Sequence, residues 1–194
     1  MYKYINQKDP QNDFVFGIHT PSGRELTINK NGCGLCSATM IAQNLAGADV
    51  TLHDIADLAV EWGYSQFIVP HHVMKIFAPV LAEKFGLHLQ TSCDGEELLE
   101  CLHNGGMAIA HSAGDKDGHV GVLSNCRHYV AVAAANGREV TVLDPSLVPG
   151  KYDMEGRREV ASVVGDEVHM DIDTLSNDCA GNIPRFFMFT KKNG

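Results

Sequence analysis

Apolar residues in the first half of the chain recur at three- and four-residue spacing, which predicts amphipathic helices. One of these segments opens with a Thr51–Asp54 capping box, a common start of a helix. Glycines at or just beyond the segment ends are typical helix stops. The expected helices are residues 36–46, 51–62, 70–86 and 94–103. Before them, residues 1–32 have the composition of extended segments and turns.

The second half changes to short apolar runs that predict strands. The expected strands are 87–90, 107–110, 129–135, 139–143 and 185–190. Asn136-Gly137 is a strong hairpin signal between two of them. Residues 145–184 read as a long loop with candidate strands at 159–164 and 167–170. Helices first and antiparallel strands last predict an α+β fold of two lobes, within a single domain over residues 1–194.

Charge and composition narrow the classes of partner. The formal net charge is −9 and no basic block occurs, which argues against nucleic acid and anionic membrane surfaces. There is no signal-like N-terminus and no apolar run of about 18 residues, so we expect a cytoplasmic protein. Its six cysteines are then expected to be free thiols. We expect no cofactor and no metal, and the oligomeric state stays open.

Cys33, flanked by Gly32 and Gly34, stands at or just before the start of the first long helix. Unpaired N–H groups and the helix dipole favour an anion there, and the thiolate is the nucleophilic form of cysteine. The two glycines leave the neighbouring backbone open to a substrate carbonyl. The alternative is a buried cysteine behind a glycine turn.

A nucleophilic cysteine needs a base and a group that orients the base. His128 opens one predicted strand, and Asp144 follows the strand paired with it. A three-residue loop, 135–137, would place His128 opposite Asp144 on the same face of the sheet, whereas a two-residue loop would place the two side chains on opposite faces. The alternatives are a strand-end histidine satisfied by a carbonyl and an ordinary Asp-Pro turn.

Other residues offer alternative sites. Cys33 and Cys36 form a C-x-x-C pair, but no βαβ unit or second ligand pair supports a redox or zinc site, so Cys36 is expected to be a small core residue. His119 is the reserve base, placed before an expected Val-Gly-Val-Leu strand. The polar loop 113–118 fits no calcium loop. Trp62, with Tyr64, Phe67, His71 and His72, lines a substrate groove in one interpretation and is plain core in the other.

Several short motifs, taken in order, resemble the C39-like cysteine peptidases of bacteria, which belong to the papain-like group. The motifs are Ile5-Asn6-Gln7-Lys8-Asp9-Pro10, Gly32-Cys33-Gly34 with its apolar helix, Gly105-Gly106 through His128-Tyr129, and Leu143-Asp144-Pro145. The resemblance covers roughly residues 5–145 and the last strand. Leu35 stands where the family usually has proline, and Cys36 where it has threonine or serine.

This resemblance implies a papain-like fold, with an N-terminal helical lobe packed on a C-terminal antiparallel sheet. It also implies Cys33 as nucleophile, His128 as base and Asp144 as orienting group. Gln7 would donate to the oxyanion, in place of the papain-type glutamine that would fall at position 27, here Thr27. The implied function is a thiol protease or amidase acting on a peptide or small amide. An acyl or peptidyl transferase and an inactive binding module remain alternatives.

Overall fold

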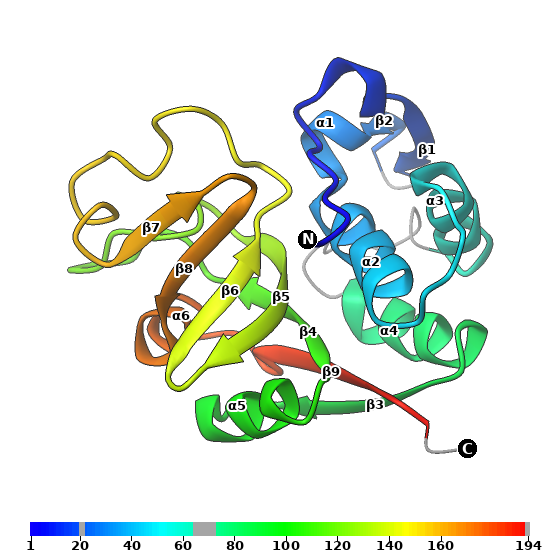
Figure 1. Ribbon diagram of the computed structural model, residues 1–194. Coiled ribbons are helices and arrows are strands. Elements are labelled where there is room, and N and C mark those ends of the chain that lie inside the picture. Colours follow the sequence, from blue (N-terminus) through cyan, green and yellow to red (C-terminus); the bar gives the residue numbers. More distant parts are fainter. Residues whose placement is uncertain (20–21, 64–72, 193–194) are drawn as a thin grey trace.

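The computed structural model describes residues 1–19, 22–63 and 73–192. Figure 1 shows two halves, with helices gathered on one side and a twisted sheet on the other. The helical half contains η1 (Pro10–Asn12), β1 (Val15–His19), β2 (Arg24–Thr27), α1 (Ile28–Asn31), α2 (Cys33–Asn44), α3 (Leu52–Glu61) and α4 (Val73–Lys84). Within it, β1 and β2 form a two-stranded antiparallel sheet. The expected arrangement of a helical lobe against an antiparallel sheet is confirmed.

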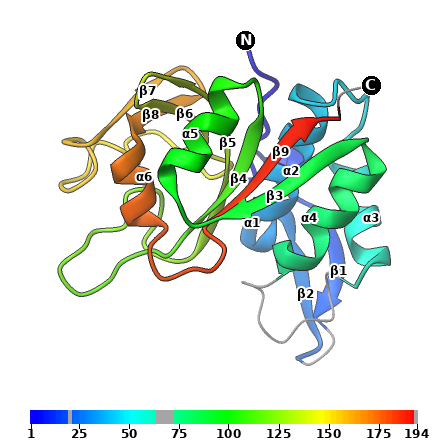
Figure 2. The same cartoon turned by 90° about the horizontal axis from the view of Figure 1, so that it is seen from below.

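The other half is built on a seven-stranded antiparallel sheet in the order β3-β9-β4-β5-β6-β8-β7. Its strands are β3 (Leu87–Ser92), β4 (Met107–Ser112), β5 (His128–Asn136), β6 (Glu139–Leu143), β7 (Ala161–Val164), β8 (Glu167–Asp171) and β9 (Phe186–Lys191). Two helices, α5 (Gly95–His103) and α6 (Ile172–Asp178), accompany the sheet. In the view from below, β3 and β9 run beside each other from α5 toward α4 (Figure 2).

Helix α2 is the central element of the fold because every residue from 34 to 42 is buried. Apart from Ser37 and Thr39, that stretch has no polar side chain, so it has no face to offer to water and lies in the interior. It contacts β5 and β4 on one side and α3 and α4 on others. Its buried residues belong to a core that includes Tyr129 and Ala131 of β5. The opposite face of β5, through Val130 and Val132, belongs to a second core with α5 and α6.

Most expected elements are present. The capping box at Thr51 and Asp54 is confirmed, and α5 covers the expected span. The first long helix begins at Cys33, three residues earlier than expected, and α4 begins at Val73 within the described residues. Residues 172–178 were expected to be loop, yet they form α6. With two large apolar residues in seven, that helix has too short a pattern to be read from sequence.

The register of the β5–β6 hairpin differs from the expectation. Asn136 pairs with Glu139, so the turn is Gly137-Arg138 and not the three-residue loop 135–137. The ladder then shifts between Val132 and Ala134, which leaves Ala133 as an extra, bulged residue. The expected pairing of residue 128 opposite 144 is therefore wrong.

The bulge nevertheless keeps the two residues on one face. Beyond it Ala131 pairs with Leu143, so position 144 falls beside Val130, two residues from His128. A shift of two residues preserves the face, whereas the unbulged ladder would have shifted by three and reversed it. Within the part of the chain described, no helix is both long and apolar enough to cross a lipid bilayer.

Candidate active site

Cys33 is the first residue of α2. Gly32 is both the C-cap of α1 and the N-cap of α2. The chain turns here so tightly that a Cβ at Gly32 would lie 2.5 Å from the Ile28 carbonyl oxygen. Glycine is thus required by the junction of two helices, beyond leaving the backbone open to a substrate. The junction presents the partly buried Cys33 at the N-terminal end of the central helix.

His128 is the first residue of β5 and is 5% exposed. Its Nε2 donates to Asp144 Oδ1 at 2.7 Å. With Nε2 engaged, Nδ1 is the ring nitrogen left for the hydrogen bond between His128 and the Cys33 thiol. The three side chains that sequence reasoning selected from distant parts of the chain therefore meet, despite the error in register.

The residues in this contact change one another's pKa values. Burial raises the pKa of Cys33, but the hydrogen bond and positive charge of His128, with N–H groups of Tyr129 and Gly34, lower it below the ordinary thiol value. Burial likewise lowers the pKa of His128, and Asp144 together with Cys33 overcomes this and raises it to about 9. These directions favour a thiolate paired with an imidazolium near neutral pH.

Asp144 is fully buried at the start of the loop that follows β6. Besides His128, its carboxylate accepts from Tyr152 Oη at 2.8 Å and from Lys151 Nζ at 2.5 Å. It also accepts from Ser146 N at 2.9 Å. Burial opposes ionisation, yet His128 and Lys151 outweigh it and hold the pKa of Asp144 well below its usual range.

Sequence reasoning missed the residues that surround Asp144. Ser146, Lys151 and Tyr152 are within eight positions of it along the chain, and that closeness was the available signal. Tyr4, which donates from its hydroxyl to the Asp144 carbonyl oxygen at 2.6 Å, is 140 positions away and carried no such signal.

Gln7 is buried between the segments that carry the three residues. Its backbone N–H donates to the Pro145 carbonyl at 2.7 Å, and its Nε2 donates to the Asn29 carbonyl at 3.0 Å. Asn29 lies in α1, just before Cys33, and Pro145 follows Asp144. The Gln7 Oε1 atom is buried without a hydrogen-bond partner among the described residues. Gln7 thus lies next to both halves of the site.

The remaining substrate-binding candidates are placed less directly. Gly34 is buried, and its N–H points to the Cys33 sulfur. Trp62 caps the end of α3 and is 54% exposed, so it is not the core residue of the alternative interpretation. The other expected members of its groove, Tyr64, Phe67, His71 and His72, lie outside the described residues.

The rival candidates have structural explanations. Cys36 is buried in the core, as expected, and burial raises the pKa of its thiol. His119 has an acidic partner, since its Nε2 lies 3.2 Å from Asp178 Oδ1. The prediction of a strand after His119 is wrong. These residues form a loop, in which the N–H groups of Val122 and Leu123 donate to the Asp178 carboxylate. The described residues contain no cluster of three or more metal-ligating side chains.

Comparison with protein-family models and with curated protein sequences finds no match. Solved structures do match. A Bacillus anthracis protein described as a C39-like peptidase superposes with a TM-score of 0.60 at 12% identity, over 100% of this chain and 96% of that one. The peptidase domain of Streptococcus ComA, a bifunctional ABC transporter of a quorum-sensing pathway, gives 0.52 at 12% identity, over 99% of this chain and 100% of that one.

These likenesses establish the fold. The protein has the fold of the C39-like peptidases, as the sequence motifs implied. Its structural neighbours are peptidases.

Proposed function

We propose that the protein is a cysteine peptidase or amidase that cleaves a peptide or amide bond through a thioester intermediate. The observation that carries the proposal is the continuous contact from the Cys33 thiol through His128 to the buried Asp144. Nucleophile, base and orienting group are thus in hydrogen-bond contact, in the order that acyl transfer requires. The peptidase neighbours support the same reaction class.

In the first half-reaction, the Cys33 thiolate attacks the carbonyl carbon of the scissile amide. An S–C bond forms, and the carbonyl π electrons move to oxygen. As the C–N bond breaks, His128 Nδ1 gives its proton to the departing amine. The products are the free amine and a thioester on Cys33, with a neutral imidazole beside it.

In the second half-reaction, His128 Nδ1 accepts a proton from a water molecule while the water oxygen attacks the thioester carbonyl. The S–C bond breaks, which releases the carboxylic acid product and restores the thiolate–imidazolium pair. An amine in place of water would give the transferase reaction. The chemistry otherwise uses the same residues.

We assign the oxyanion hole to the Cys33 backbone N–H and the Gln7 side-chain amide. Gln7 Nε2 uses one hydrogen on Asn29 and has a second hydrogen to donate. Preorganised donors of this kind act most strongly where charge develops in the transition state. We assign substrate contacts to the backbone of Gly32 and Gly34 and to the exposed ring of Trp62.

The test is a peptide digest of a whole proteome, incubated with the protein and analysed by mass spectrometry for new termini. We expect new cleavage products with the parent protein and none with Cys33→Ala. A peptide vinyl sulfone should add its mass to Cys33 in the parent. Cys126→Ala removes an exposed thiol close to the site in sequence and serves as the matched control, with cleavage unchanged.

Products that carry a transferred amine in place of a new free carboxyl terminus would assign the transferase reaction to the same residues. The absence of Cys33-dependent products, with Cys33 no more reactive toward the vinyl sulfone than Cys93 or Cys126, would contradict the proposal. That result would favour a binding module on a peptidase fold.

A further inference from the structure

Among the described residues, Lys151 is the one lysine whose ammonium group pairs with a buried carboxylate. Its side chain is 9% exposed, and its Nζ lies 2.5 Å from Asp144 Oδ2. The other acceptors are Ser146 Oγ at 2.7 Å and the Ser146 carbonyl at 3.4 Å. An ammonium group has three hydrogens, and three acceptors surround it here.

A buried lysine is costly unless its charge is paired, because the ammonium group loses its hydration. Burial lowers the pKa of Lys151, and the adjacent Asp144 opposes that effect. Lys151 is therefore a second cationic partner of the Asp144 carboxylate. It bonds Oδ2, whereas His128 bonds Oδ1. The orienting acid of this site thus has two cationic partners.

We propose that Lys151 is a positioning residue that keeps Asp144 ionised and in place while His128 passes its proton during the reaction. The catalytic meaning of this inference rests on the proposed function. The alternating charges of Cys33, His128, Asp144 and Lys151 make a neutral set before attack. Once Cys33 is acylated and His128 has lost its proton, Asp144 and Lys151 still form a neutral pair.

Without Lys151, the acyl-enzyme would contain Asp144 as a buried and unpaired anion. That anion would hold the proton on His128, because an isolated buried charge is far less stable than a paired one. The imidazole would then be a poor acid for the leaving amine and a poor base for water. Lys151 removes this penalty by pairing the carboxylate in both states.

The other groups around the pair fit this role. Tyr152 donates a neutral hydrogen bond to Asp144 Oδ2, so it orients the carboxylate without balancing its charge. Ser146 Oγ lies 3.1 Å from His128 Nε2 and 3.2 Å from Asp144 Oδ1. The same oxygen accepts from Lys151 Nζ, so Ser146 contacts all three residues. Arg157 lies near enough to repel the Lys151 charge, and its guanidinium bonds the Lys151 carbonyl.

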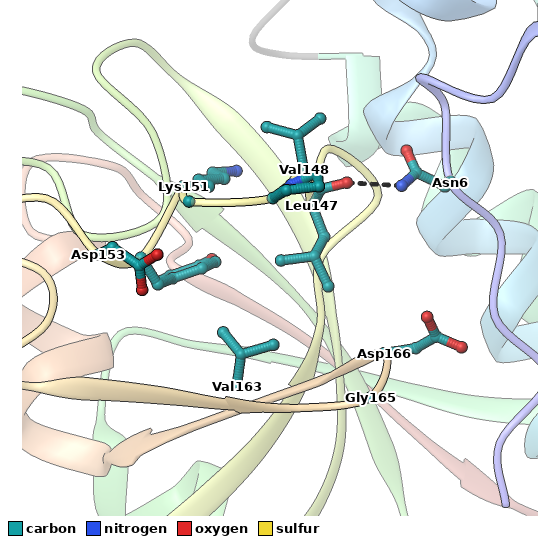
Figure 3. A pocket seen from close by; sticks show the side chains of 11 residues that line it. Asn6, Leu147, Val148, Lys151, Asp153, Val163, Gly165 and Asp166 are labelled. Carbon is teal, nitrogen blue, oxygen red and sulfur yellow. Dashed lines mark hydrogen bonds between the residues drawn. The ribbon is translucent and has the colours of Figure 1, made fainter.

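Lys151 also lines a pocket of about 320 Å³. Figure 3 shows Lys151 in the pocket wall, across from Asn6, whose amide donates to the Leu147 carbonyl. Asp153 and Asp166 lie at other points of the pocket wall. Lys151 forms its ion pair with Asp144.

The test is an NMR titration of the His128 imidazole in a Cys33→Ala background, where Asp144 is its charged partner and Lys151 is the cation paired with Asp144. Loss of the signal in His128→Asn assigns it among ten histidines. We expect Lys151→Met and Lys151→Gln to raise the midpoint by at least about one pH unit, the scale of a neighbouring charge. Lys151→Arg should keep the parent midpoint, and so should Lys84→Met, which removes an exposed lysine of α4.

A midpoint unchanged in both neutral variants would overturn the inference. If both neutral variants fail to fold, recovery of folding in Lys151→Gln/Asp144→Asn would support it, because that pair removes both charges together. Failure of the double variant as well would overturn it. The titration needs no turnover, so a protein that cleaves no peptide but shows the shift refutes the proposed function and not the charge pairing.

Discussion

At the scale of single residues, the candidate site is a set of charges that are costly alone and stable together. Asp144 is fully buried and His128 is nearly so. Each has its pKa moved toward the charged form by the other, against the effect of burial. The reactivity of Cys33 should therefore depend on its neighbours more than on its own exposure.

We expect iodoacetamide to alkylate Cys33 rapidly below pH 7, because His128 lowers the pKa of the thiol. In His128→Ala the reaction should require a pH near or above the ordinary thiol value of about 8.5, since only the N–H groups of Tyr129 and Gly34 then oppose the effect of burial. Mass spectrometry of the labelled peptides measures both rates. Exposed Cys93 and Cys126 are internal references, and identical Cys33 profiles in the two proteins would refute the ion pair.

The same pair predicts how stability depends on pH. The pKa of His128 is about 9 in the fold and about 6.5 in an unfolded chain, so its protonation stabilises the fold fully below about pH 6.5. That contribution is lost as the pH rises through 9. Urea unfolding should therefore show that His128→Gln costs more free energy at pH 6 than at pH 10.

The control for this measurement is His88→Gln, which removes an exposed imidazole on β3. Its effect on the free energy of unfolding should be small at both pH values. A cost for His128→Gln that stays constant from pH 6 to 10 would show that folding does not raise the pKa of the imidazole.

The next residue-scale prediction concerns Gly32. A Cβ there would approach the Ile28 carbonyl oxygen to 2.5 Å and the Ile28 Cα to 2.8 Å, both backbone atoms that cannot turn aside. We expect Gly32→Ala to lower the free energy of unfolding by about 1–3 kcal/mol, the usual cost of overpacking, and to slow alkylation of Cys33. Lys30→Ala, at an exposed position of α1, should do neither.

At the scale of elements, the bulge in β5 decides whether the base and the acid share a face. The small residues Ala131, Ala133, Ala134 and Ala135 fit either face of a sheet, so their pattern does not reveal the bulge. The packing reveals it, because Ala131 and Ala133 lie in one core whereas Ala135, two residues further on, packs against the other.

We expect deletion of Ala133 to be tolerated. It removes the extra residue and leaves the pairs on both sides of it unchanged, so His128 should still meet Asp144. Insertion of a second alanine after Ala133 should instead shift the strand by one position and turn His128 to the opposite face. The rate of Cys33 alkylation at pH 6 should stay high in the deletion variant and fall in the insertion variant. An equal fall in both variants would contradict this account of the bulge.

At the scale of the whole molecule, an N-terminal segment joins the helical half to the sheet half beside the site. Its contacts reach the loop after β6 at three points: Tyr4 to Asp144, Asn6 to Leu147 and Gln7 to Pro145. Figure 1 shows this N-terminal segment running between the two halves. Asp144 is thus held at its backbone by the N-terminal segment and at its carboxylate by Lys151 and Tyr152.

We expect Tyr4→Phe to lower the free energy of unfolding by about 0.5–1.5 kcal/mol, because the Asp144 carbonyl loses its 2.6 Å donor. Alkylation of Cys33 should also slow, since the acid behind His128 is less firmly held. Tyr2→Phe removes a hydroxyl from the same segment and is the matched control. Equal effects of the two substitutions would show that the Tyr4 contact has no special role.

The sequence by itself determined most of the long helices and strands, the α+β arrangement and the three residues that meet. Periodicity, capping residues and glycine stops act over a few positions, so a local pattern records them in full. Cys33 and His128 were recognisable because each stands at the start of a regular element, which fixes where its side chain points.

The tertiary structure alone decided the register, the short helix α6 and the surroundings of Asp144. Lys151, Tyr152 and Tyr4 act on that carboxylate through contacts made only when distant segments pack together. A bulge among alanines has no sequence signal, and a buried charge finds its partners in space. Patterns of a few residues therefore identified the reacting groups, whereas packing decided what holds and balances them.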